Sequence, residues 1–238
     1  MGTPHTINRR EATIAIGIGV LFMIIALIVQ EIAQDIPVFL FLIKDHFSTS
    51  GIVGELSVFE LKNSILYSLY IGLAAGFIQE GFTFLAFDTR ARNMAFFIGL
   101  GFSIVDIVIL FFETFVVPVI EIHRSLILTP FEGLLVSLNI VSSVLFHPGT
   151  ATFMKWGQIR GFARITYIIS AFLHTAIDGG VVYTDLYVIM NRSTYITASA
   201  IFWTVAMSIS VIIFIVGLTK LSSVSDADEF RVEKPVVF

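Results

Sequence analysis

The stretch ATIAIGIGVLFMIIALIV fills residues 12–29 and contains no charged side chain. A run of about 18 apolar residues is long enough for a helix to cross the hydrocarbon core of a bilayer. Five further runs have comparable length and composition: Ser64–Phe87, Met94–Ile120, Glu132–Trp156, Ala163–Met190 and Tyr195–Leu218. We therefore predict an all-α, polytopic membrane helix bundle of about six transmembrane helices.

The composition indicates the same class of protein. Of the 238 residues, 56% are hydrophobic and 13% are charged, whereas roughly a quarter of the residues of a soluble domain are charged. The net charge of -4 comes without a dense basic patch, which argues against a nucleic-acid partner. The chain has no cysteine, so disulfides and thiolate chemistry are excluded, and any metal ligand must be His, Asp or Glu.

Two segments between the first two spans are expected to differ from them. Pro37–Ile43 is apolar but too short to cross a bilayer alone, which favours an interfacial or re-entrant segment. Lys44–Lys62 is polar, which is typical of a loop or a surface helix. We predict one transmembrane helical domain over residues 1–218 and a polar, mobile cytoplasmic tail over residues 219–238.

The distribution of Lys and Arg predicts the orientation in the membrane. In a six-span arrangement, ten of the fourteen basic residues lie on the side of both termini: Arg9, Arg10, Arg90, Arg92, Lys155, Arg160, Arg164, Lys220, Arg231 and Lys234. The other side holds Lys44, Lys62, Arg124 and Arg192. Because Lys and Arg are enriched in cytoplasmic loops, we expect a multi-pass protein of the cell membrane with cytoplasmic N- and C-termini.

Five ionisable residues fall inside the predicted spans, where a charge is costly and normally faces the bundle interior or a wet cavity. They are Glu80, Asp106, His147, His174 and Asp178. At about 1.5 Å per residue, counted from the end of each span on the side of the termini, they lie roughly 11–23 Å deep. Two of these spans run inward and two run outward, so the shared layer predicts one site. We expect a water-filled cavity there that opens toward the cytoplasm.

The spacing of the polar residues along each predicted helix places them in stripes on one helix face. His174 and Asp178 are four residues apart and share a face. A second stripe consists of Glu132, Asn139, Ser143 and His147, and a third of Asp106 and Glu113. A single buried His or Asp is often only a hydrogen-bonded contact between membrane helices, and this interpretation stays open for each residue.

Other residues in the spans have structural interpretations. Glu113 and Glu132 lie near the outer ends of their spans and are expected to be wet or helix-terminal. Pro148 follows His147 and predicts a kink beside the site. Close helix packing is expected at Gly72, Gly76, Gly81, Gly99 and Gly101.

Four short motifs over about residues 74–180 resemble those of the PrsW and YhfC families, glutamic-type intramembrane proteases related to the CAAX-processing membrane proteases. The first is AGFIQEGFTFLAF, which contains Glu80 after small residues. The second is Gly99–Asp106, in which an acid follows a Gly-Leu-Gly-Phe stretch. His147 matches the His of a later helix, and His174 with Asp178 matches the final His-x-x-x-Asp motif.

The chain departs from the family pattern at three places. Gln79 stands where the family has the first Glu of a pair. Thr83 and Phe84 stand where a basic residue is usual, and Asp106 stands where the second motif has Glu. A regulatory membrane subunit that keeps the fold without catalysis therefore stays open as an alternative.

The resemblance implies hydrolysis of a peptide bond in a membrane protein or a lipid-anchored peptide. Glu80 would activate water, His174 would assist proton transfer or hold the water, and Asp178 would orient His174. His147 would donate to the oxyanion, and Asp106 would act as a second acid or orient His147. No cofactor is required by this scheme.

Two other functions use the same residue types. A zinc site could form from the two histidines and one or two of the acids, although no HExxH helix is present. A proton-coupled transporter could relay protons through the same groups, but we find no inverted repeat in its favour.

Overall fold

A computed structural model describes residues 7–44, 52–121, 128–225 and 228 of the chain. Over these residues it is built of helices and contains no strand. Six helical stretches are long and apolar enough to cross a membrane: Arg9–Lys44, Ser64–Phe87, Met94–Ile120, Pro130–Ile159, Ala163–Met190 and Arg192–Ser222. The predicted all-α bundle of six transmembrane helices is therefore confirmed.

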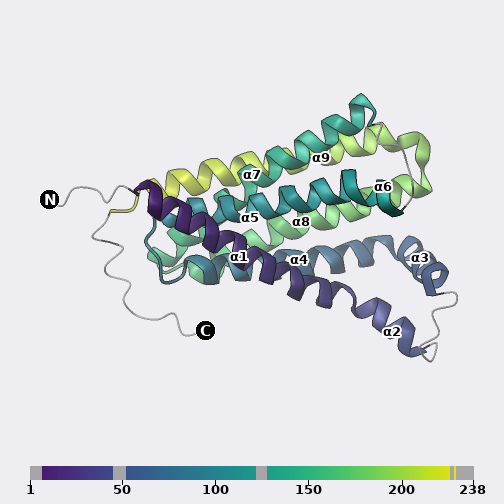
Figure 1. The fold of residues 1–238 in the computed structure, drawn as a ribbon, viewed down its shortest axis with the longest axis horizontal. Coiled ribbons are helices and arrows are strands. Elements are labelled where there is room, and N and C mark those ends of the chain that lie inside the picture. Colours follow the sequence, from purple (N-terminus) through teal and green to yellow (C-terminus); the bar gives the residue numbers. More distant parts are fainter. Residues whose placement is uncertain (1–6, 45–51, 122–127, 226–227, 229–238) are drawn as a thin grey trace.

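The helices follow one another with short connections. Their bounds are α1 Arg9–Gln34, α2 Ile36–Lys44, α3 Ile52–Lys62, α4 Ser64–Phe87, α5 Met94–Phe111, α6 Val117–Glu121, α7 Pro130–Ile159, α8 Ala163–Met190 and α9 Tyr195–Ser222. A π-helical segment, Phe112–Val116, joins α5 to α6, and a 3₁₀ turn, Arg192–Thr194, precedes α9. The start of α1 and the end of α9 lie at the same end of the bundle (Figure 1). We call it the terminal end, and the opposite one the distal end.

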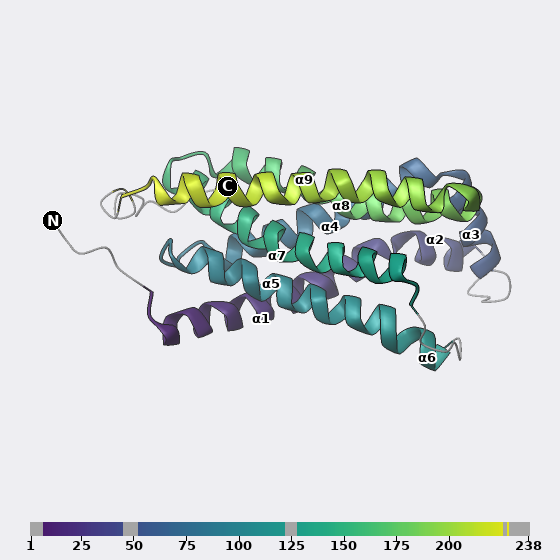
Figure 2. The ribbon, with the colours of Figure 1, turned by 90° about the horizontal axis from the view of Figure 1, so that it is seen from above.

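The long helices form two layers. In the view of Figure 2, α1, α5, α7 and α9 follow one another in that order, and each packs on the next. Helices α4 and α8 pack tightly on each other, and join the first layer through contacts of α4 with α1 and of α8 with α7. The four helices that carry the predicted site, α4, α5, α7 and α8, therefore surround a common centre.

Local sequence explains where the helices begin and end. Asn8 and Thr129 begin α1 and α7, and each forms a capping box with a glutamate three residues later. Glu132 is the partner of Thr129, which confirms the helix-terminal position expected for it. Gly161 lies between α7 and α8 at a φ of 80°, a left-handed conformation that favours glycine after a helix end.

The segment between the first two spans is helical. α2 follows α1 after a turn at Asp35, and none of its residues is buried. Pro37–Ile43 is therefore not a re-entrant segment inserted between the long helices, and its interfacial position stays a prediction. In Lys44–Lys62 the structure has α3, in line with the surface helix expected, while residues 45–51 lie outside the described part.

The π-helical segment has a cause in the sequence. Pro118 has no N–H, so it cannot donate to the carbonyl of Thr114 as a regular helix requires. One residue earlier, Val117 N–H reaches back to the carbonyl of Phe112. Single π turns of this kind often occur at functional sites, and this one presents the exposed Glu113 at the distal end.

Glycines bring the helix backbones close together. A Cβ on Gly72 would lie 2.8 Å from the Cα of Gly179, and one on Gly101 would lie 2.8 Å from the Cα of Gly19. Close packing is thus confirmed at Gly72, Gly76, Gly99 and Gly101. The prediction is wrong for Gly81, where the nearest atom to such a Cβ is the Tyr167 hydroxyl oxygen at 3.6 Å.

The chain beyond residue 218 begins as part of the bundle. α9 extends to Ser222, so residues 219–222 belong to a helix and not to the predicted tail. Val224 is buried, and its carbonyl accepts a hydrogen bond from the Arg92 guanidinium. Asp228 lies 3.6 Å from Arg160. Residues 226–227 and 229–238 lie outside the described part of the chain.

Two glycines of α1 provide a matched test of this packing. We expect Gly19→Ala to destabilise the bundle by about 1–3 kcal/mol, because its Cβ would overpack the backbone of α5. Gly17→Ala is the control, since nothing lies within 4 Å of a Cβ there. Unfolding by heat or detergent titration should separate the two variants. Equal stability would show that α1 and α5 do not pack as described.

Candidate active site

Side chains from four helices meet in the middle of the bundle. Glu80 comes from α4, Asp106 from α5, His147 from α7 and His174 from α8. One nitrogen of each imidazole and a carboxylate oxygen of Glu80 lie within 4.8 Å of one another. The centroids of the two imidazole rings are 5.3 Å apart. The shared depth expected from the sequence thus corresponds to one cluster.

His174 connects two carboxylates. Its Nδ1 lies 2.9 Å from Oε1 of Glu80, and its Nε2 lies 3.4 Å from Oδ2 of Asp178, one turn further along α8. Thr150 also donates a hydrogen bond to Oε1 of Glu80, at 3.3 Å. The side chain of Glu80 is fully buried, so these contacts fix its orientation.

His147 forms a second pair with Asp106. The distance between Nε2 of His147 and Oδ2 of Asp106 is 2.6 Å, and Ser143 donates to the same oxygen at 3.0 Å. Ser103 in turn donates to the carbonyl of Ser143 at 2.8 Å, which ties α5 to α7. Asp106 is therefore placed to orient His147, which is one of the two roles that the resemblance implied for it.

Several polar atoms of the cluster lack a hydrogen-bond partner among the described residues. Two belong to the central side chains: Oε2 of Glu80 and Nδ1 of His147. The hydroxyls of Thr83 and Ser170, each on the same helix face as Glu80 or His174, are also buried and unpaired. An unpaired buried polar group costs about 1–3 kcal/mol, so these atoms indicate a site for water, an ion or substrate.

Gly99 and Pro148 allow α5 and α7 to approach at the cluster. A Cβ on Gly99 would lie 2.6 Å from the carbonyl oxygen of His147. α7 remains helical through Pro148, and Thr152 donates a hydrogen bond to the Pro148 carbonyl at 2.7 Å. Pro148 removes one helical hydrogen bond beside the site without ending the helix.

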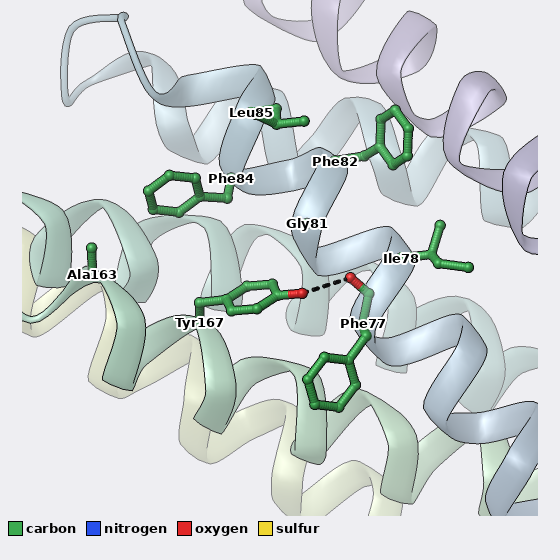
Figure 3. A pocket seen from close by; sticks show the side chains of 8 residues that line it. All are labelled: Phe77, Ile78, Gly81, Phe82, Phe84, Leu85, Ala163 and Tyr167. Atoms are coloured by element: carbon green, nitrogen blue, oxygen red, sulfur yellow. Dashed lines mark hydrogen bonds between the residues drawn. The ribbon is translucent and has the colours of Figure 1, made fainter. Parts of the chain in front are cut away.

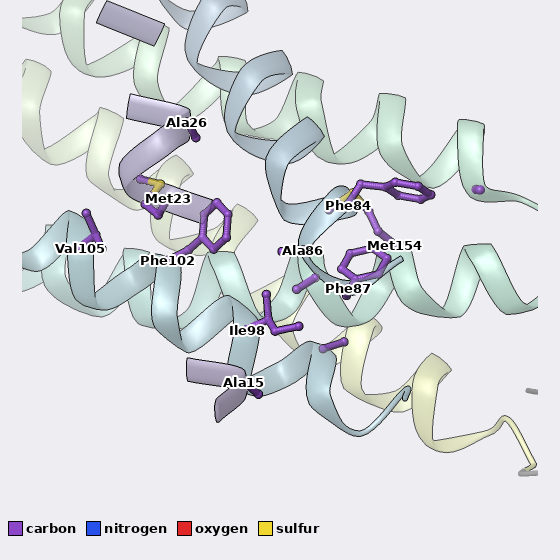
Figure 4. Packing of buried hydrophobic residues seen from close by; sticks show 13 residues of the cluster. Ala15, Met23, Ala26, Phe84, Ala86, Phe87, Ile98, Phe102, Val105 and Met154 are labelled. Carbon is purple, nitrogen blue, oxygen red and sulfur yellow. The ribbon is translucent and has the colours of Figure 1, made fainter. Parts of the chain in front are cut away.

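Large apolar side chains fill the bundle between the cluster and the terminal end. Figure 4 shows Phe84, Phe87, Ile98 and Met154 packed there, all of them buried. Beyond them, the buried Lys155 donates to the carbonyl of Phe87 at 3.2 Å. The expected opening of the site toward the terminal end is therefore not found among the described residues, because apolar packing occupies that path.

The polar side of the cluster faces the distal end instead. The side chains of Asp106 and Asp178 are 30% and 32% exposed, whereas Glu80 is fully buried. A cavity of about 390 Å³ lies one to two helical turns further out, lined in part by Glu113, Glu132 and Asp185. We call it the distal cavity.

A separate hollow lies on the outer face of α4 and α8. It has a volume of about 400 Å³, and its lining is almost entirely apolar. Figure 3 shows Gly81 at its floor beside the ring of Tyr167, which donates a hydrogen bond to the Phe77 carbonyl at 3.0 Å. Because Gly81 follows Glu80 directly, the hollow lies close to the helix turn that carries Glu80.

The side chain of Gln79 forms its hydrogen bond outside the cluster. Its amide nitrogen donates to Oε1 of Gln30 on α1 at 2.7 Å, and both side chains are buried. The position at which the resembling families have the first Glu of a pair thus joins α4 to α1 in this chain.

Some residues of the cluster were not predicted from the sequence. Thr150 was missed, although its spacing of three from His147 places it on the same face. Ser103 was missed as well, because a serine in an apolar run usually bonds its own helix backbone.

Comparison of the chain with family models, curated proteins and solved structures found no match. The resemblance to the PrsW and YhfC families therefore rests on the motifs alone and stays a prediction.

The Gln30–Gln79 contact can be tested by a double-mutant cycle. We expect Gln79→Leu to destabilise the protein by about 1–3 kcal/mol, because it leaves a buried amide without its partner. The double variant Gln30→Leu, Gln79→Leu should lose less than the sum of the single variants. Stability in detergent micelles is the measurement. Strict additivity would argue against the contact.

Proposed function

We propose that the protein is a membrane-embedded hydrolase that cleaves a peptide bond of a membrane protein or a lipid-anchored peptide. One observation carries this proposal: Glu80, His147 and His174 converge from three helices and leave a carboxylate oxygen and a ring nitrogen unpaired. Hydrogen bonding between helices alone does not require three ionisable groups at one point.

Glu80 is the residue that we propose to activate water. Its Oε1 is held by His174 and Thr150, while its Oε2 is free to accept the proton of an attacking water molecule. The water oxygen would add to the peptide carbonyl carbon, and the proton would pass to the leaving amine. His174, in contact with both Glu80 and Asp178, is placed to assist that transfer.

His147 is the proposed donor to the oxyanion. Asp106 holds its Nε2, so the ring has a fixed orientation, and Nδ1 remains available to the centre. A doubly protonated ring would donate through Nδ1 to the negative oxygen that develops in the transition state. Asp106 is then a positioning residue that also balances the charge of the ring.

The surroundings suggest how the reactants arrive. Water can approach from the distal cavity, and an apolar substrate segment can approach through lipid at the hollow beside Gly81. From the distribution of Lys and Arg, we propose that the protein lies in the cell membrane with both termini in the cytoplasm.

Replacement of Glu80 tests the function. Purified protein is reconstituted into liposomes with a library of single-span peptides, and new chain ends are identified by mass spectrometry in ¹⁸O-labelled water. We expect cleavage with incorporation of ¹⁸O into the new carboxylate, and a loss of about 10²–10⁴-fold in rate for Glu80→Gln. Cleavage by Glu80→Gln at the wild-type rate would remove Glu80 from the chemistry.

The matched control for this experiment is Glu31→Gln. It makes the same chemical change at an exposed position of α1, and we expect it to keep full activity. If no peptide is cleaved but a partner protein still binds, the alternative of a regulatory subunit without catalysis takes precedence.

A proton-coupled transporter needs a polar path to both ends of the bundle. The cluster of Phe84, Phe87 and Met154 interrupts such a path toward the terminal end. We therefore expect liposomes containing the protein to show no proton flux above that of empty liposomes, as read with an entrapped pH-sensitive dye. Flux that requires Asp106 and Asp178 would favour transport.

A further inference from the structure

We propose that the distal cavity binds the ammonium or guanidinium group of a lysine or arginine side chain in the substrate peptide. The assignment to a substrate rests on the proposed function, whereas binding of the cation can be measured without cleavage. The cavity is lined by α7, α8, α9 and the end of α5 with the π-helical segment that follows it. Three of these helices also carry Asp106, His147 and His174, so a peptide that extends from the centre toward the distal end would pass the cavity.

The cavity carries negative charge without a basic side chain to balance it. Glu113, Glu132 and Asp185 line it, and its lining contains no Lys, Arg or His. Glu132 accepts hydrogen bonds from Thr129, whereas Glu113 and Asp185 form no hydrogen bond or ion pair with any residue that the structure describes. Both lie in helical stretches long enough to span a membrane, where a charge without a partner is costly. A cation from outside the protein would be that partner.

A buried hydroxyl indicates a ligand independently of the carboxylates. Ser199 on α9 is 4% exposed and lines the cavity. A serine inside a membrane helix often bonds the carbonyl four residues earlier, as Ser137, Ser208 and Ser210 do in this protein. The Ser199 hydroxyl forms no such bond, and no other described residue pairs with it. Its oxygen is therefore left to accept a hydrogen bond from a group inside the cavity.

The lining suits an organic cation better than a metal ion. Tyr195, Phe202 and Trp203 line the cavity together with the carboxylates, and aromatic faces attract ammonium and guanidinium groups. A metal ion needs several ligands around one point. The carboxylates of the distal cavity do not form a group of three, within the described part of the chain, whose donor atoms lie within 4.8 Å of one another. A group with several N–H donors can contact carboxylates that lie further apart.

The spacing along α8 relates the cavity to the centre. Asp185 follows His174 by eleven residues, which is close to three helical turns and about 16 Å along the helix axis. An extended peptide covers about 3.3–3.6 Å per residue. A Lys or Arg about three to six residues from the cleaved bond therefore has its charged group at the level of the cavity. Lipid amine headgroups carry similar charge, but the helix face shared with the centre favours the substrate.

The test compares two single-span peptides that differ in one side chain. One has a lysine beyond the distal end of an alanine–leucine span, and the other has norleucine, an uncharged residue of similar length. Binding of each fluorescent peptide is read by anisotropy in maltoside micelles, which contain no charge and no amine. Full-length Glu80→Gln protein is used, so that cleavage does not disturb the equilibrium. We expect the lysine peptide to bind at least about 10-fold more tightly, and the difference to shrink at high salt.

Variants show whether the carboxylates hold the cation. Asp185→Asn and Glu113→Gln should each reduce the preference for lysine, and the double variant should abolish it. Asp185→Lys should instead favour a peptide with glutamate at the same position. Both side chains are exposed and unpaired, so we expect the bundle to keep its stability. Glu55→Gln is the matched control, because it removes an exposed carboxylate of α3 at the distal end and should keep the full preference (Figure 1).

The position of the lysine tests the distance to the centre. Wild-type protein is given peptides in which one lysine is moved stepwise along the chain, and the cleaved bond is located by mass spectrometry. We expect the cleaved bond to move with the lysine and to stay about three to six residues from it. A cleaved bond that does not follow the lysine would contradict the assignment to a substrate side chain.

The outcomes separate the cation site from the hydrolase. Equal binding of the two peptides, or a preference that the double variant retains, overturns the cation site. If phosphatidylethanolamine displaces the lysine peptide completely and the position of the lysine has no effect, the cavity binds a lipid headgroup and the assignment to substrate is overturned. Cleavage without a preference for lysine overturns the cation site and leaves the hydrolase. A preference for lysine without cleavage of any peptide overturns the hydrolase and leaves the site.

Discussion

An ionisable side chain in the hydrocarbon layer must find partners inside the protein, because lipid offers neither hydrogen bonds nor charge compensation. In this bundle the requirement is met by pairing across helices. Each imidazole contacts a carboxylate at its Nε2, and His174 contacts Glu80 as well. These contacts constrain how α4, α5, α7 and α8 are rotated about their axes, since a turn of any one of them would expose a charged group to lipid. The polar centre and the helix arrangement therefore depend on each other.

Glycine makes the short distances at this centre possible. In a membrane, helices do not gain from burying apolar area against each other as they do in water, so close backbone packing contributes more to their association. Gly99 lets α5 approach the carbonyl of His147, and Gly72 lets α4 approach α8 at Gly179. The same approaches bring the carboxylate of Glu80 within hydrogen-bonding distance of His174. Small residues on the outside of the centre thus determine its geometry as directly as the ionisable residues do.

Much of this could be predicted from the sequence, and the remainder has a physical reason. The six spans follow from the lengths of the apolar runs, and the common layer of Glu80, His147 and His174 follows from helical rise. The direction in which the centre opens could not be predicted, because Phe84 and Met154 inside the bundle are as apolar as the residues that face lipid. The pairing of Asp106 with His147 required the relative rotation of two helices, which periodicity in one chain segment does not define. Gly81 was misjudged because a glycine that lines a hollow and one that packs against a backbone look alike in sequence.

Because of the apolar packing at the terminal end, the two sides of the centre differ in polarity. Phe87 and Met154 lie between the centre and the terminal end, whereas the carboxylate-lined distal cavity lies on its other side. A centre placed in this way would exchange protons and water with the distal side rather than with the fluid that bathes the two chain ends. In the orientation that we propose from the basic residues, that side would be the exterior of the cell.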